Sequence, residues 1–315
     1  KLVNLGNISL LAGNLFLALS GYGLTALFYW NLAVTGFNCL FFFLTARKLL
    51  PEVKLFRRFR PDALKLVIGY SASIVVYQIL ANLLVLFERS WVTRRFGTEN
   101  LTFYVVSMTV SFQLHYFIAS LVLVVFPLAS ELQNDRERLQ RLYAKATKII
   151  VALVVIIGLT LIVQSRLFLT LWLGEDFASR SAHLLVIHTI SMSLVAGATV
   201  SWQTTEGLGY PNFNLLLIVL SWIFTVPLVI FLSEGYGPTG VAIGRLVGFS
   251  VMFASVFYVE KWFFRKVLLR FWLALAARLV LAAVAAALVE TLVNKYLPVA
   301  WTTFLFSCAV GVLSF

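Results

Sequence analysis

Long apolar stretches, separated by short breaks that contain Gly, Pro or charged residues, run through the whole of the 315-residue chain. Most of them reach the roughly 20 apolar residues that an α-helix needs to cross the hydrocarbon core of a bilayer. They lack the strict alternation of barrel strands, so helices are the expected spanning structure. The pattern predicts ten transmembrane helices, at about residues 3–20, 24–45, 66–90, 101–127, 147–164, 183–202, 212–232, 238–258, 271–290 and 298–315.

The composition supports this interpretation and excludes a soluble globular domain. Hydrophobic residues make up 61% of the chain and charged residues 12%, and the mean hydropathy is +0.94. We therefore predict an all-α fold, a polytopic integral membrane helical bundle. The chain begins with Lys1 rather than Met and ends within an apolar stretch at Phe315, so we expect it to be part of a longer protein.

Basic residues are distributed unequally between the loops on the two sides of the predicted bundle. Sixteen lie on one side and six on the other, and the positive-inside rule places the richer side in the cytoplasm. The net charge of +12 then reflects topology and contact with anionic membrane lipids, and a nucleic-acid partner is rejected. The cytoplasmic set is Arg47, Lys48, Lys54, Arg57, Arg58, Arg60, Lys65, Arg136, Arg138, Arg141, Lys145, Lys148, Lys261, Arg265, Lys266 and Arg270.

Two further expectations concern the ends of the spans. The longest outer loop is expected at about Gln164 to Ala182. Tryptophans near predicted span ends are interpreted as interfacial anchors. These are Trp30, Trp91, Trp172, Trp202, Trp262, Trp272 and Trp301.

A short internal repeat supports a two-bundle organisation. GYGLTALFYWNLAV begins at Gly21 and GYGPTGVAIGRLVG at Gly235, an offset of 214 residues. Both copies occupy an outer turn and the first half of the next span, and six spans separate them, so they have the same orientation. Parallel repeats of this kind build two-bundle transporters. A potassium selectivity filter and a nucleotide loop are both poor fits, and a tight turn explains the Gly-Tyr-Gly better.

The chain offers little for catalysis or for a cofactor. It contains no His-Glu-x-x-His, Walker A or Cys-x-x-Cys motif, and nearly all of its thirteen acidic residues lie in loops. His183 and His188 are five residues apart and do not share a helix face, which argues against a metal pair, and packed hydrogen-bonding roles are expected for them and for His115. We predict a protein that is not an enzyme and that has no metal or cofactor.

Charged residues inside spans are costly and are the default functional candidates. Arg245 lies about seven residues into its span, roughly 10 Å deep, and we identify it as a candidate for binding a phosphate or pyrophosphate group in a cavity. The alternative is an arginine that pairs with a carbonyl group or extends to the interface. Arg89 and Asn31 are further candidates for binding the substrate head group.

Glu88 is the one acidic residue expected well inside a span, next to Arg89. It is a candidate ion-coupling site for a proton or Na⁺, and the alternative is an interfacial charge pair. Asn4, Asn7 and Asn14 line one face of the first span, which should therefore contact protein or a watery cavity.

The order of the segments resembles the polysaccharide-export branch of the MOP/MATE-like superfamily, which includes lipid II flippases and MATE drug exporters. The resemblance runs through most of the chain. It rests on RKLLPEVKLFRRFRPDALK at 47–65, LANLLVLFERSWVTRRFGTENLTFYVVS at 80–107, FPLASELQNDRERLQRLYAKATK at 126–148, LFLTLWLGEDFASRSAHLL at 167–185, and TTEGLGYPNFNLLLIVLSWIFTVPLVIFLSEGYGPTGVAIGRLVG at 204–248.

The resemblance implies fourteen spans in two six-helix bundles and two peripheral helices, of which this chain holds the last ten. The implied parts are the end of the amino-terminal bundle at 1–46, basic cytoplasmic linkers at 47–65 and 259–270, the carboxy-terminal bundle at 66–258 and the peripheral spans at 271–315.

The implied function is a flippase in the bacterial inner membrane. Its substrate would be an undecaprenyl-pyrophosphate oligosaccharide for O-antigen, capsule or exopolysaccharide, moved by alternating access, with membrane lipids, a polysaccharide polymerase and a chain-length regulator as partners. A MATE-like drug or metabolite exporter and a membrane glycosyltransferase or polymerase are the alternatives. The basic character and Arg245 favour an anionic substrate over a cationic one, whereas the scarcity of buried acids leaves ion coupling open.

Overall fold

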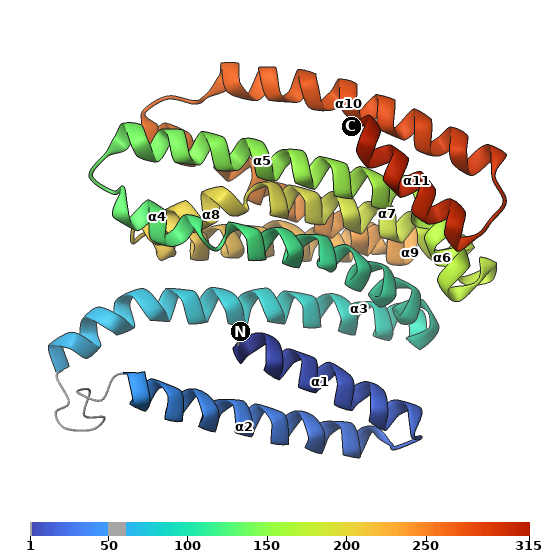
Figure 1. Cartoon of the computed structure of the whole chain (residues 1–315), viewed down its shortest axis with the longest axis horizontal. Helices are drawn as coiled ribbons and strands as arrows, with labels where there is room; N and C mark the ends of the chain where they lie inside the picture. The colour runs from blue at the N-terminus through green and yellow to red at the C-terminus, as the bar shows by residue number, and fades with distance from the viewer. Residues whose placement is uncertain (1, 50–60) are drawn as a thin grey trace. The chain divides into compact units, whose positions relative to one another are not determined.

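The computed structural model describes the backbone of residues 2–49 and 61–315, and the side chains of residues 9–49 and 68–315. The chain divides into two compact units, Lys1–Lys65 and Leu66–Phe315. In the described residues all regular structure is helical (Figure 1). The predicted all-α class is confirmed.

The first unit contains a helical hairpin of α1 (Leu2–Leu19) and α2 (Leu24–Leu49). The turn between them has Gly21 at a φ of 76°, a conformation that glycine adopts without a steric penalty. The predicted turn at the first Gly-Tyr-Gly is therefore confirmed. Asn14 and Asn31 join the two helices by side-chain hydrogen bonds of 3.4 Å and 3.0 Å. Asn4 and Asn7 have side chains outside the described residues.

The second unit contains two helices too long for a single crossing. These are α3 (Pro61–Val122) and α9 (Pro211–Phe264), of 62 and 54 residues. At 1.5 Å per residue each would be about 80–95 Å long if it were straight, roughly three times the thickness of the hydrocarbon core. Each turns back at a glycine with non-helical dihedral angles, Gly97 in α3 and Gly237 in α9. Figure 1 shows α3 reversing its direction, so each helix supplies two spans.

The remaining helices complete the unit. They are α4 (Val125–Glu131), α5 (Arg136–Val163), α6 (Ser165–Leu173), α7 (Glu175–Gly197), α8 (Thr199–Gly207), α10 (Leu269–Tyr296) and α11 (Trp301–Ser314). Within the part of the chain that the structure describes, six helices are long and apolar enough to cross a membrane. If α3 and α9 each count as two crossings and the shorter α1 and α11 as one each, the total is ten, as predicted.

The predicted outer loop at Gln164 to Ala182 was wrong. Residues 165–173 form α6, and α7 begins at Glu175 after Gly174, which has a φ of 92°. The short helix α6 buries Leu169 completely and leaves Arg166 exposed, so an amphipathic helix takes the place of a loop.

The helix that contains the predicted fifth span begins about three turns before residue 147. Asp135 caps α5 by accepting a 3.0 Å hydrogen bond from the backbone N–H of Arg138. The first turns bury Leu139 and Tyr143 and expose Arg136, Arg138 and Arg141. The basic segment is therefore the first part of the same helix as the apolar stretch that follows it. Likewise, α9 continues to Phe264 and α10 begins at Leu269, so most of 259–270 is helical.

Two of the tryptophans interpreted as interfacial anchors pack inside the second unit instead. Trp272 is buried in the main apolar core, where it contacts Phe253 and Phe257, and Trp202 packs against the same core. Outside this core, large apolar side chains such as Phe231 and Leu281 are three-quarters exposed. Such a surface suits contact with lipid tails rather than water.

The buried carboxylate of Glu260 fastens the end of α9 to the start of α10. It accepts hydrogen bonds from the backbone N–H of Leu268 at 2.9 Å and from the indole N–H of Trp272 at 2.7 Å. Replacing Trp272 with Phe keeps an aromatic ring but removes one donor to a buried acceptor. We expect the free energy of unfolding to fall by about 1–3 kcal/mol, measured by SDS titration of the full-length protein in mixed micelles. Trp262→Phe, at a more exposed site, should change it far less, and equal losses would contradict this role.

Candidate functional site

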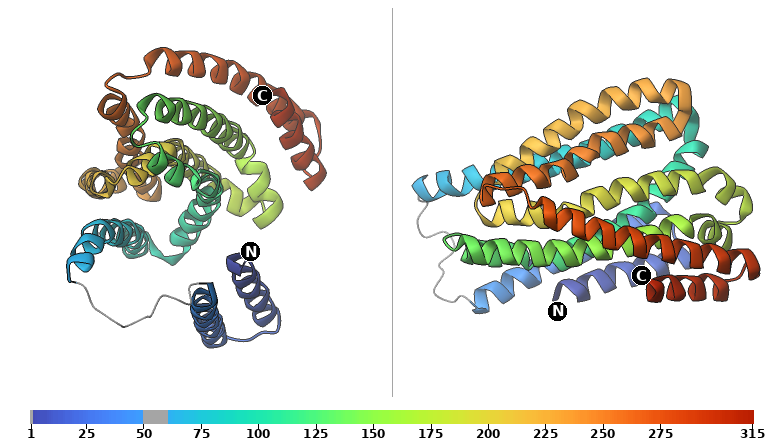
Figure 2. Two further views of the ribbon diagram at one scale, coloured as in Figure 1. Left: turned by 60° about the vertical axis from the view of Figure 1, so that its left-hand side comes forward. Right: turned by 90° about the horizontal axis from the view of Figure 1, so that it is seen from above.

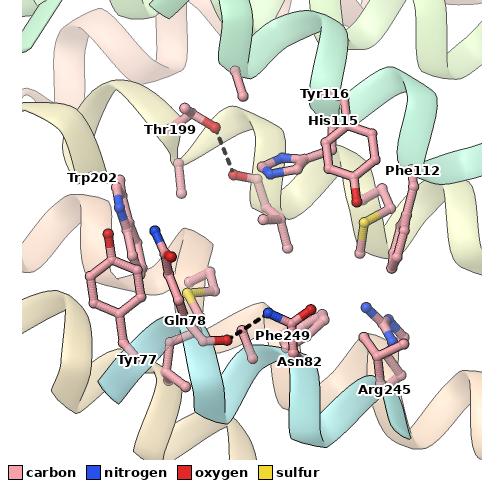
Figure 3. Close-up of a pocket in the computed structure, with 18 of the residues that line it drawn as sticks. Tyr77, Gln78, Asn82, Phe112, His115, Tyr116, Thr199, Trp202, Arg245 and Phe249 are labelled. Atoms are coloured by element: carbon pink, nitrogen blue, oxygen red, sulfur yellow. Dashed lines mark hydrogen bonds between the residues drawn. The ribbon is translucent and has the colours of Figure 1, made fainter. Parts of the chain in front are cut away.

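A cavity of about 790 Å³ lies within the second unit, between α3, α7, α8 and α9 (Figure 3). Its volume is in the range of sites that hold small molecules. Five aromatic side chains line it, Tyr77, Phe112, Tyr116, Trp202 and Phe249. Amide and hydroxyl groups come from Gln78, Asn82, Gln113, Thr199 and Gln203. Among the described residues that line the cavity none is acidic, whereas Arg89 and Arg245 are both basic.

Arg245 reaches the cavity wall from the second leg of α9. Its side chain is 2% exposed, and its Nη1 donates a 2.5 Å hydrogen bond to Oε2 of Glu88. The guanidinium carbon lies 5.1 Å and 4.6 Å from the ring centroids of Phe112 and Phe249, distances at which cation–π attraction operates. The ion pair with Glu88 and the two rings hold the guanidinium group in place. Figure 3 shows Arg245 at the cavity near Phe112.

Glu88 lies behind Arg245 and is completely buried. Besides the guanidinium group, its Oε2 accepts a 3.0 Å hydrogen bond from the hydroxyl of Tyr104, while Oε1 has no partner in the described structure. Glu88 is thus paired with a residue 157 positions away rather than with its neighbour at the interface. Its role in ion coupling stays a prediction.

Arg89 follows Glu88 on α3 and also lines the cavity. It is partly buried, and its Nε has no hydrogen-bond partner in the described structure. Of the two cavity arginines, only Arg245 forms a salt bridge with a carboxylate in the part of the chain that the structure describes. The cavity therefore has net positive character on its Arg89 side, which suits an anionic group.

Sequence reasoning missed the opposite end of the cavity, where Glu206 orients two aromatic rings. Its Oε1 accepts hydrogen bonds from the hydroxyl of Tyr77 at 2.6 Å, the indole N–H of Trp202 at 2.8 Å and the amide of Asn214 at 3.3 Å. The rings of Tyr77 and Trp202 meet edge to face, with centroids 5.1 Å apart. Trp202 and Glu206 are four residues apart on one helix face, and that spacing was the available signal.

A family model described as "Polysaccharide biosynthesis protein" matches residues 5–182, more than half of the chain. The chain belongs to this polysaccharide biosynthesis family. A protein of Shigella flexneri named "Putative O-antigen transporter" is 27% identical over 171 residues, which are 53% of this chain and 40% of that protein. The resemblance to the polysaccharide-export branch is thereby confirmed.

This member of the polysaccharide biosynthesis family also shares its fold with a solved structure. Lipid II flippase MurJ, in an inward closed conformation, superposes with a TM-score of 0.71 at 17% identity, covering 98% of this chain and 64% of that one. The chain thus spans less than half of the Shigella protein and less than two thirds of MurJ.

Asn31, the third residue predicted to bind the substrate head group, lies in the first unit. Its amide donates to Oδ1 of Asn14 at 3.0 Å and to the carbonyl oxygen of Leu27 at 2.7 Å. These bonds satisfy both amide hydrogens within the hairpin. A role for Asn31 in binding the head group stays a prediction.

The three histidines occupy three different environments. His115 lines the cavity, and His183 is 2.9 Å from the hydroxyl of Thr239. His188 is completely buried beside the ring of Tyr104, and neither ring nitrogen has a partner in the described structure. The expected hydrogen-bonding role is therefore supported for His183 alone, because Nδ1 of His115, like both ring nitrogens of His188, has no partner in the described structure.

Proposed function

We propose that this protein moves an undecaprenyl-pyrophosphate-linked oligosaccharide from the cytoplasmic to the periplasmic leaflet of the bacterial inner membrane by alternating access. The product would be used for O-antigen, capsule or exopolysaccharide synthesis, together with a polysaccharide polymerase and a chain-length regulator. Family membership supports the general assignment. The observation that carries the substrate class is the cavity, which combines two arginines with amide and aromatic side chains and, among its described residues, has no acid.

Each part of that lining has a counterpart in the proposed substrate. The guanidinium groups of Arg89 and Arg245 would hold the pyrophosphate, since arginine makes paired hydrogen bonds to phosphate oxygens. Amides such as Gln78 and Gln203 would bind sugar hydroxyls, and the Tyr77 and Trp202 rings would pack on sugar faces. The isoprenoid tail would remain in lipid.

The buried ion pair supplies a means of coupling in this proposal. A pyrophosphate that binds Arg245 would compete with Glu88 for the guanidinium group. Glu88 without its partner would be a buried carboxylate that favours binding a proton or Na⁺. Binding of the substrate to Arg245 would thus be coupled to binding of the ion to Glu88.

A MATE-like exporter of cationic compounds is the main alternative. Cation binding in a membrane cavity calls for carboxylates on the wall, whereas the described wall presents arginines. The relatives named above are called a transporter and a flippase, and a membrane glycosyltransferase is therefore the weaker alternative.

The test uses the full-length protein in liposomes that contain an undecaprenyl-pyrophosphate oligosaccharide. An external glycosidase reports the rate at which head groups become exposed. We expect exposure to depend on the protein and to slow at least about tenfold in Arg89→Ala, since one charge-assisted bond contributes about 1.5–3 kcal/mol.

Arg180→Ala, which removes an exposed arginine paired with Glu99, is the matched control and should retain the native rate. No protein-dependent exposure would reject this substrate and favour export of a cationic compound. Equal slowing in Arg89→Ala and Arg180→Ala would keep the function but reject the cavity site.

A further inference from the structure

Another buried carboxylate, Glu290, belongs to α10, a helix that does not line the cavity. It is completely buried where α10 packs against both α5 and α11 (Figures 1 and 2). Thr160 donates to its Oε1 at 2.9 Å, and the amide of Gln164 is 3.3 Å from its Oε2. The same amide is 2.5 Å from the hydroxyl of Ser307, so three helices meet at this carboxylate.

No positive charge compensates Glu290 in the part of the chain that the structure describes, because no Lys, Arg or His nitrogen lies within 4.0 Å of it. The titratable group that faces it is Cys308 of α11, which carries no positive charge. Glu88 differs, since Arg245 balances it. A lone ionised carboxylate inside a membrane span costs several kcal/mol, so a cation or a proton must neutralise it.

The surroundings of Glu290 are rich in oxygen atoms. The hydroxyl of Thr160 contacts the carboxylate itself. The hydroxyl of Ser307 is 3.4 Å from the backbone carbonyl oxygen of Glu290. Asn294, one turn further along α10, donates its amide to Gln164 at 2.8 Å, and its Oδ1 is buried without any partner in the described structure. A carboxylate with hydroxyl oxygens in contact, and an unpartnered amide oxygen one helical turn away, offers the oxygen ligands that a hard cation binds.

Gly311 of α11 makes room for the carboxylate. A methyl group at this position would lie 1.9 Å from Oε1 of Glu290, so any other residue would displace the group. Residues of α5, α10 and α11 therefore form the site together, and Gly311 leaves the space that the carboxylate occupies.

We propose that Glu290, with Thr160, Gln164, Asn294 and Ser307, binds a small monovalent cation, either Na⁺ or a proton. The site lies near the ends of α5 and α10 that are remote from the basic cytoplasmic segments. A bound cation would neutralise Glu290 and hold α10 and α11 against α5. This inference does not depend on the substrate proposed above.

The first measurement is equilibrium binding of radioactive Na⁺ to the purified full-length protein at several pH values. If Na⁺ is the occupant, we expect saturable binding that weakens as the pH falls and that is lost in Glu290→Gln. Glu234→Gln, which removes an exposed carboxylate, is the matched control and should bind as the native protein does. Gly311→Ala keeps the carboxylate but displaces it, and we expect affinity to fall at least about tenfold.

If a proton is the occupant, Na⁺ does not bind, and infrared spectra should contain the C=O band of a protonated buried carboxyl group. That band should be absent in Glu290→Gln, present in Glu234→Gln and shifted in Gly311→Ala. The proposal is overturned if Gly311→Ala and Glu290→Gln alter neither Na⁺ binding nor this band. These experiments do not measure head-group exposure, so a negative result would reject the cation site without rejecting the proposed flippase function.

Discussion

Replacing Arg245 with methionine, with Glu88 unchanged, is expected to lower the free energy of unfolding by about 3–5 kcal/mol. The substitution leaves a completely buried carboxylate with the Tyr104 hydroxyl as its one remaining described partner on Oε2. Losing one member of a buried ion pair costs this much because the remaining charge has neither water nor a counter-charge. SDS titration of the full-length protein in mixed micelles measures the effect.

The double variant Glu88→Gln with Arg245→Met separates the charge from the packing. Removing both charges should restore most of the lost stability, because the pair contributes little net stability over neutral groups of similar size. Head-group exposure should nevertheless remain impaired, since the cavity arginine is missing. Arg180→Met, at an exposed pair, should cost less than about 1 kcal/mol. Additive losses in the double variant would contradict a buried, coupled pair.

The second large effect is expected at Gly244, where the two legs of α9 touch. A methyl group there would lie 2.8 Å from the backbone nitrogen of Val229 and 3.0 Å from the carbonyl carbon of Leu228. Backbone atoms cannot rotate away, so the legs must separate. Gly244→Ala should lower the free energy of unfolding by about 1–3 kcal/mol and, because Arg245 is the next residue, should also slow head-group exposure.

Gly69→Ala is the matched control for this substitution. Gly69 lies within α3, and nothing approaches within 4 Å of the position its methyl group would take. The same chemical change should there leave stability unchanged or raise it by up to about 1 kcal/mol, because alanine favours helix more than glycine does. Equal effects at Gly69 and Gly244 would show that helix propensity, and not close packing, determines the result.

Gly240, Gly244 and Gly248 illustrate how local patterns predict contacts. Their four-residue spacing puts them on one helix face, and small residues at this spacing let membrane helices approach closely. The structure places all three against the first leg of α9, at Leu232, Val229 and Thr225. The spacing was visible in the sequence, but the partner helix was not.

The pairing of Glu88 with Arg245 shows the limit of such patterns. Each is a conspicuous charge in its span, so both could be selected as candidates from the cost of burying charge. Their contact joins residues 157 positions apart, and no local periodicity encodes it. Glu290 and Glu206 escaped notice for a related reason: each lies near a predicted span end, where a carboxylate is expected to reach water.

The sequence by itself determined the all-α membrane class, the approximate number of crossings and the chain reversals at Gly21 and Gly237, because the length of apolar runs and the special conformations of glycine are local properties. It also determined which charges are costly enough to demand a role. Only the tertiary structure decided where those charges find their partners, that Trp202 and Trp272 are packed inside the bundle, and that residues 165–173 form a helix. These outcomes depend on which helix faces meet, and in a membrane nearly every face is apolar, so hydrophobic pattern does not distinguish lipid from protein contact.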